Sequence, residues 1–93
     1  MLTVVALIQA VPGKSALLKA ELEKLVRATR RENGCVQYDL HQDNTDPDRF
    51  LFYENWASRE LWQAHLASAH LLAFRQATEG LTQTTLWEMT RVG

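Results

Sequence analysis

The fold of this chain is decided by two runs of strand-forming sequence, ENGCVQYDLHQ at residues 32–42 and RFLFYENW at residues 49–56. Between them lies DNTDPD at residues 43–48, which is rich in residues that favour turns. The second run is aromatic and contains neither Pro nor Gly, as expected of a half-buried strand. The pattern predicts a β-hairpin closed by a six-residue acidic loop.

The composition indicates one globular domain covering residues 1–93. Hydrophobic residues make up 46% and charged residues 23%, and the net charge of −1 does not favour a nucleic-acid-binding surface. The longest apolar run, Val4 to Ile8, is too short to span a bilayer, and no secretion signal opens the chain. A single cysteine, Cys35, excludes an internal disulfide and suits a reducing compartment, so we expect a cytoplasmic protein.

Residues 2–11 predict a first strand that is apolar on both faces. Because side chains alternate along a strand, the two faces carry Leu2, Val4, Ala6 and Ile8 on one side and Val5, Leu7 and Val11 on the other. From Ser15 onward, leucines recur at helical spacing and predict a helix. Residues 58–79 predict a second helical segment with a break at 68–70, and residues 81–92 predict a last strand.

The resulting order β-α-β-β-α-β is that of the ferredoxin-like α+β fold. Right-handed crossovers place the first and third strands at the centre of a four-stranded antiparallel sheet, with the helices on one face. The other face of the first strand is too apolar for water. We therefore expect a homodimer in which a second copy covers this face through Val5, Leu7 and Val11.

The strand at residues 49–56 presents four residues on one face: Phe50, Phe52, Glu54 and Trp56. If this face meets the helices, Glu54 lies among aromatic rings, and desolvation raises its pKa enough to make it a possible proton acceptor. The alternative is that Glu54 pairs with an arginine or a backbone group and only orders the fold. Trp56 and Trp62 either form flat walls for an aromatic ligand or pack in the core.

His65 follows Leu61 by one helical turn and is expected to face the sheet, where a neutral imidazole could take a proton from a phenol or enol. His70 either reaches the same pocket or only caps the helical break. The two histidines are five residues apart, whereas a two-histidine zinc motif on one helix needs a spacing of about four. No third ligand is evident, so we expect no metal. Tyr38 and His41 lie on opposite faces of their strand and cannot both line one pocket.

Four motifs occur in order along the chain: Glu32-x-Gly34-Cys35-x-x-Tyr38-Asp39-Leu40-His41-Gln42-Asp43, Asp46-Pro47-x-Arg49-Phe50, Tyr53-Glu54-x-Trp56 and His65-x-x-Ser68-x-His70. Together with the opening strand, they resemble the antibiotic biosynthesis monooxygenase family over about residues 1–90. The resemblance implies a dimer of ferredoxin-like subunits whose sheets pack together as a dimeric α+β barrel. Members of this family oxidise anthrones or quinols with oxygen and no cofactor, degrade haem, or isomerise a phosphorylated quorum-sensing sugar derivative.

Departures from the family pattern narrow the expected chemistry. The Asn, Trp and His positions of the haem-degrading members fall here on Ala6, His65 and Arg75, so haem turnover is not expected. The substrate-holding Asn and Tyr of the anthrone oxidases fall on Phe52 and Trp62, which implies a more apolar pocket.

His65 and His70 match residues that the quinol-oxidising and isomerase-type members carry, and Trp56 matches the Trp of the anthrone oxidases. The leading hypothesis is a cofactor-independent monooxygenase that oxidises a small aromatic phenol or quinol with O2, with His65 or Glu54 accepting the phenolic proton. The residues expected to bind the substrate are Phe52, Trp56, Trp62 and His70. The alternatives are an isomerase of a small phosphorylated hydroxyketone and a non-catalytic dimeric ligand-binding module. The sequence does not name the substrate.

Overall fold

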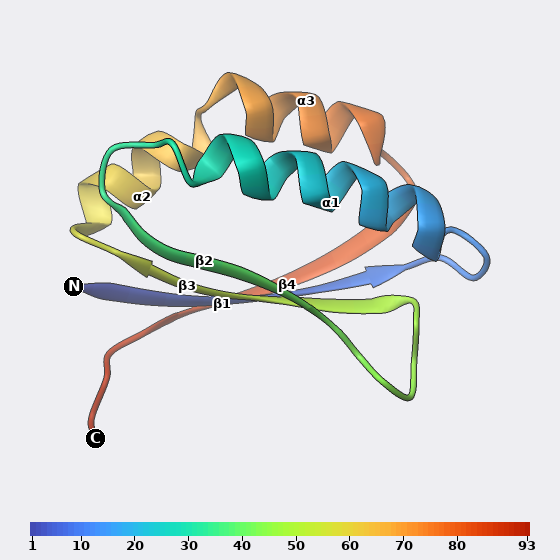
Figure 1. The fold of residues 1–93 in the computed structure, drawn as a ribbon, viewed down its shortest axis with the longest axis horizontal. Helices are drawn as coiled ribbons and strands as arrows, with labels where there is room; N and C mark the ends of the chain where they lie inside the picture. The colour runs from blue at the N-terminus through green and yellow to red at the C-terminus, as the bar shows by residue number, and fades with distance from the viewer.

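The computed structural model describes residues 1–93, and Figure 1 shows their arrangement. The elements in chain order are β1 (Leu2–Ala10), α1 (Ser15–Thr29), β2 (Cys35–Gln42), β3 (Arg49–Trp56), α2 (Arg59–Leu66), α3 (Ala69–Ala77) and β4 (Thr82–Met89). The strands form one antiparallel sheet in the order β2-β3-β1-β4. The predicted ferredoxin-like α+β fold and the central position of the first and third strands are therefore confirmed.

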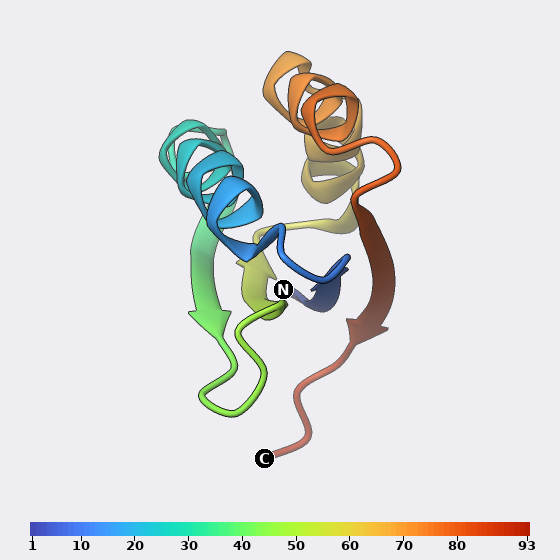
Figure 2. The same cartoon turned by 90° about the vertical axis from the view of Figure 1, so that its right-hand side faces the viewer.

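The helices cover one face of the sheet. Figures 1 and 2 show α1, α2 and α3 on the same side, whereas the loop at residues 43–48 and the C-terminus extend to the other side. Four β1 side chains that face the helices are buried, as strand alternation requires: Val4, Ala6, Ile8 and Ala10. They share one apolar cluster with the leucines that recur along α1: Leu18, Leu22 and Leu25. Burial of this apolar surface holds α1 on the sheet.

The turn between α1 and β2 depends on Gly34. This residue has a φ of +84°, a conformation that residues with side chains rarely adopt. A Cβ at this position would also collide with the side chain of Leu61 in α2. The absence of a side chain therefore lets α2 pack closely against the turn, and the same turn carries Glu32.

The second helical segment is divided into α2 and α3 by a break at residues 67–68, one residue earlier than predicted. The hydroxyls of Ser58 and Ser68 each accept a hydrogen bond from the backbone N–H three residues further on, at 3.2 and 3.3 Å. Each helix thus has its own N-cap, which accounts for the break. As a result, His65 and His70 belong to different helices.

The outer face of the sheet carries apolar side chains that no helix covers. Val5 lies between Tyr53 and Trp87 in the strand register, and these two aromatic residues are 38% and 43% exposed. The first strand was expected to include Val11, but β1 ends one residue earlier, at Ala10, and Val11 begins the turn that follows. None of the helices has the length and apolar character needed to cross a membrane.

Candidate active site

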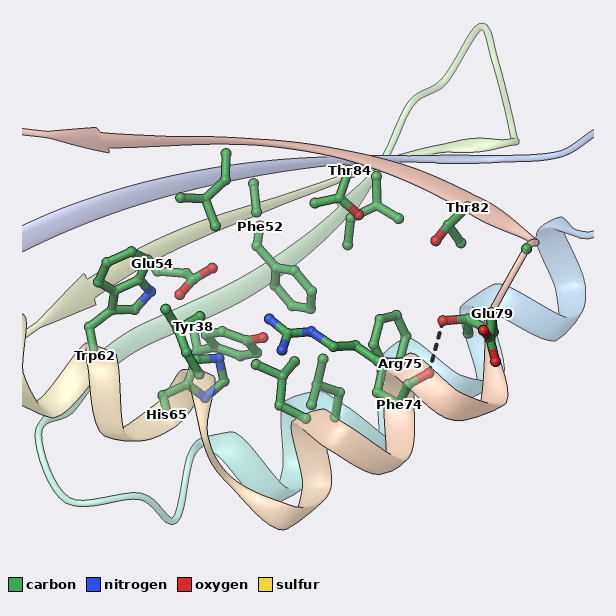
Figure 3. Close-up of a pocket in the computed structure, with 18 residues that line it drawn as sticks. Tyr38, Phe52, Glu54, Trp62, His65, Phe74, Arg75, Glu79, Thr82 and Thr84 are labelled. Atoms are coloured by element: carbon green, nitrogen blue, oxygen red, sulfur yellow. Dashed lines mark hydrogen bonds between the residues drawn. The ribbon is translucent and has the colours of Figure 1, made fainter.

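A cavity of about 320 Å³ lies between the inner face of the sheet and the helices (Figure 3). Eighteen residues line it, ten of them hydrophobic. The side chains with ionisable or hydroxyl groups in its wall are Tyr38, Glu54, His65, Arg75, Thr78, Glu79, Thr82 and Thr84. This volume is at the lower end of the range of small-molecule sites, about 300–1,000 Å³.

The structure brings four of the predicted site residues together in the wall of this cavity: Phe52, Glu54, Trp62 and His65. Phe52 and Glu54 are two residues apart on β3 and therefore both point to the inner face of the sheet. Trp62 and His65 are three residues apart on α2 and therefore share one helix face. These two local periodicities explain why sequence reasoning could place the four side chains in one site.

Trp56 was also expected in the wall, and this prediction is wrong. Trp56 is completely buried and does not line the cavity. It is the last residue of β3, and α2 begins three residues later and covers it. Its indole ring packs against the ring of His65 at a centroid distance of 4.8 Å, and its Nε1–H donates a hydrogen bond to Oε1 of Glu54 at 2.9 Å. Trp56 therefore supports two residues of the cavity wall from behind.

Glu54 is a buried carboxyl group, only 3% exposed. Burial raises its pKa to about 7, although the hydrogen bond from Trp56 lowers it, and the charge of Glu32 contributes a smaller increase. Near neutral pH, Glu54 therefore exists in both protonated and ionised forms. In the cavity it could accept a proton or donate one.

His65 is equally buried and is held by a carboxylate. Its Nδ1 lies 2.5 Å from Oε2 of Glu32, which accepts the hydrogen bond. This bond assigns the proton of a neutral His65 to Nδ1 and leaves Nε2 as a lone-pair acceptor. Burial lowers the pKa of His65, while the hydrogen bond and charge of Glu32 oppose that decrease. The geometry therefore supplies a neutral imidazole that can act as a base.

His70 lies outside the cavity, so the prediction that it contacts the substrate is not supported by its position. Its Nε2–H donates to the same Oε2 of Glu32 at 2.8 Å. The ligand-forming atoms of Glu32, His65 and His70 all lie within 4.8 Å of one another, which is close enough to share a divalent cation. With a proton on Nδ1 of His65 and on Nε2 of His70, both rings donate to the carboxylate, and two hydrogen bonds then hold the cluster together.

Sequence reasoning missed Tyr38 and Arg75 as residues of the site. Burial raises the pKa of Tyr38 above its usual range, so its phenol stays protonated, and its ring stacks on Phe52 with centroids 4.3 Å apart. Although Arg75 is an exposed residue, Figure 3 shows its guanidinium reaching into the cavity toward Tyr38 and Phe52. No ion pair or side-chain hydrogen bond holds Arg75. Strand alternation could have identified Tyr38, whereas an arginine at the end of a helix gives no comparable signal.

A sequence profile described as "Antibiotic biosynthesis monooxygenase" matches residues 1–77 of the chain. The chain belongs to the antibiotic biosynthesis monooxygenase family. The family suggested by the sequence motifs is thus confirmed. Most residues that line the cavity of this family member lie within the matched range. The lining residues that come after residue 77, such as Thr82 and Thr84 of β4, lie outside it.

Individual relatives agree with this assignment. The Mycobacterium tuberculosis protein named "Putative monooxygenase Rv0793" is 34% identical over 73 residues, which is 77% of this chain and 71% of that protein. The Escherichia coli protein named "Probable quinol monooxygenase YgiN" is 32% identical, with 86% of each chain covered. The crystal structure of PA3566 from Pseudomonas aeruginosa superposes with a TM-score of 0.93 at 38% identity, covering 99% of this chain and 94% of that one. Family and relatives together support a monooxygenase-like function for this antibiotic biosynthesis monooxygenase family member.

Proposed function

We propose that this protein is a cofactor-independent monooxygenase that oxidises a small aromatic phenol or quinol with O2. The observation that carries the proposal is His65, a buried imidazole that is held at Nδ1 by Glu32 and lies in the wall of a largely apolar cavity. The names of the relatives agree with monooxygenase chemistry, and one of those names includes the word quinol.

The first step is removal of the phenolic proton. Nε2 of His65 accepts it, and the resulting imidazolium is paired with the Glu32 carboxylate through the Nδ1–H bond. The phenolate is stabilised by the Arg75 guanidinium, which has no protein partner, and by a hydrogen bond from the protonated Tyr38. Glu54 is the second candidate for the base, because it lines the same cavity and titrates near neutral pH.

The phenolate then reacts with oxygen. It passes one electron to O2, and the two radicals combine to form a C–O bond, which gives a peroxide anion on a ring carbon. His65 returns its proton to this peroxide, and loss of water leaves one oxygen atom on the ring as the carbonyl of a quinone. The hydrogen of that ring carbon leaves with the water. The phenol gives up four electrons in all, two for the oxygen atom that stays on the ring and two for the oxygen atom that is reduced to water.

Oxygen uptake with a panel of hydroquinones and naphthohydroquinones tests the proposal. We expect substrate-dependent O2 consumption, and with ¹⁸O2 one labelled atom in the product and one in water. His65→Gln, which keeps size and polarity but cannot act as a base, should lower kcat by about 10²-fold or more. Full activity in His65→Gln together with loss of activity in Glu54→Gln would transfer the role of base to Glu54. Absence of oxygen uptake over the whole panel, with proton exchange on hydroxyketones instead, would favour an isomerase.

We also propose that the protein forms a homodimer through the outer face of its sheet. The exposed apolar side chains on that face support this, since Tyr53 and Trp87 flank Val5 across three neighbouring strands. Burial of a few hundred Å² on each subunit, at about 25 cal/mol per Å², stabilises association by several kcal/mol before its entropic cost is subtracted.

A further inference from the structure

A chain of hydrogen bonds leads from the cavity to the protein surface. It begins at His65, whose side chain is 4% exposed, continues through Glu32 at 16%, and ends at His70 at 28%. The three residues come from α2, from the turn before β2, and from α3. The exposed end lines a groove between α1 and α3, and two residues of this groove, Leu25 and Phe74, also line the candidate active site.

We propose that Glu32 and His70 are positioning residues for the base His65, with Glu32 fixing the tautomer of His65 and His70 fixing the orientation of Glu32. This inference rests on the proposed function, because it concerns how the base of that reaction is prepared. Neither residue lines the cavity, so both act through His65 and not on the substrate.

The tautomer argument follows from the donor and acceptor properties of the three groups. Oε2 of Glu32 is the acceptor for both rings, so it selects Nδ1–H on His65 and Nε2–H on His70. Without this acceptor a neutral His65 would populate both tautomers, and the Nε2–H form cannot take a proton from the substrate.

His70 has a separate effect on the same carboxylate. Glu32 is only partly buried, so it could turn toward water and release His65. The hydrogen bond from Nε2 of His70, at 2.8 Å, opposes that rotation. When His65 gains a proton, the carboxylate held in this place neutralises it, which offsets the effect of burial and of the neighbouring charges of His70 and Arg75.

The test compares four variants of the full-length protein: Glu32→Gln, His70→Leu, His70→Gln and Glu23→Gln. Glu32→Gln removes the charge but keeps the shape. His70→Leu removes the donor, whereas the amide of His70→Gln can still donate from nearly the position of Nε2. Glu23 is an exposed acid on α1, and its replacement is the matched control.

Two readouts are needed. The first is ¹⁵N NMR of the histidine side chains at about pH 8, which measures the tautomer of His65 without any substrate. The second is kcat and KM for the hydroquinone oxidised best. We expect Glu32→Gln to raise the Nε2–H population of His65 and to lower kcat by about 10–100-fold with little change in KM. His70→Leu should lower kcat by about 10-fold, and His70→Gln should restore most of it.

The proposal is overturned if the His65 tautomer and kcat of Glu32→Gln match those of the Glu23→Gln control. It is also overturned if His70→Gln is as impaired as His70→Leu, since the donor would then be irrelevant. If treatment of the purified protein with a chelator changes the ¹⁵N signals of His65 and His70, these residues bind a metal ion. The metal ion, and not the chain of hydrogen bonds, would then hold the cluster, and the proposal would be overturned. If the wild type oxidises none of the quinols, the proposed function fails, while the tautomer measurement still decides whether Glu32 positions His65.

Discussion

Replacing Glu54 by Gln tests how strongly the fold desolvates this carboxyl group. Burial raises the pKa of Glu54 from 4.5 to about 7. Because the folded state then holds the proton more tightly than the unfolded chain, the stabilising effect is complete below pH 4.5 and is lost as the pH rises to about 7. At 1.36 kcal/mol per pKa unit, the loss amounts to roughly 3 kcal/mol.

The variant keeps the size of the side chain and removes its ionisation. The Gln carbonyl oxygen can still accept the 2.9 Å hydrogen bond from Nε1–H of Trp56. Its amide N–H groups lack a partner, which costs about 1–3 kcal/mol at every pH. His65, whose pKa burial lowers, has a pH effect of the opposite sign, but this effect occurs in both proteins and cancels in their difference.

Urea denaturation at fixed protein concentration, between about pH 4.5 and pH 8, provides the measurement. The difference in free energy of unfolding between Glu54→Gln and wild type should move by roughly 3 kcal/mol in favour of the variant as the pH rises. If the two free energies run parallel over this range, Glu54 does not titrate near neutrality. The argument that it can exchange protons in the cavity would then be refuted.

Three further predictions concern the parts of the fold that hold the site in place. Gly34→Ala should lower the free energy of unfolding by about 2–4 kcal/mol in urea denaturation, because a positive φ and contact with Leu61 both oppose a Cβ. Gly13→Ala, with a similar φ but no neighbour, should cost only about 1 kcal/mol, and equal losses would exclude the contact as a cause. Ser68→Ala removes the N-cap of α3 and should lower Tm by about 4–8 °C, whereas an unchanged melting curve would argue against the cap. Trp87→Glu should halve the mass measured by light scattering at micromolar concentration, and a wild type that is already monomeric would contradict the proposed dimer.

The sequence by itself determined the order of the elements and which residues face the helices. These elements show periodic patterns of apolar residues: the hairpin at residues 32–56, the leucines of α1, and β1 with its two apolar faces. A period of two residues indicates a strand and a period of 3.6 residues indicates a helix. The positions of Glu54 and His65 in one cavity followed from the same two periods. The end of β1 was predicted one residue too late and Trp56 was misplaced, because a periodic pattern does not show where a strand ends or which buried side chain lies behind another.

Only the tertiary structure decided which polar groups meet. Glu32 is 33 residues from His65 and 38 from His70, and no spacing along the chain relates them. They come together because Gly34 lets α2 pack against the turn that carries Glu32, and because the cap at Ser68 starts a new helix between the two histidines. Arg75 reaches the cavity wall because α3 packs against α1 and α2 above the sheet. Such contacts depend on how separate elements pack, and a polar side chain that bonds across elements leaves no periodic signal in the sequence.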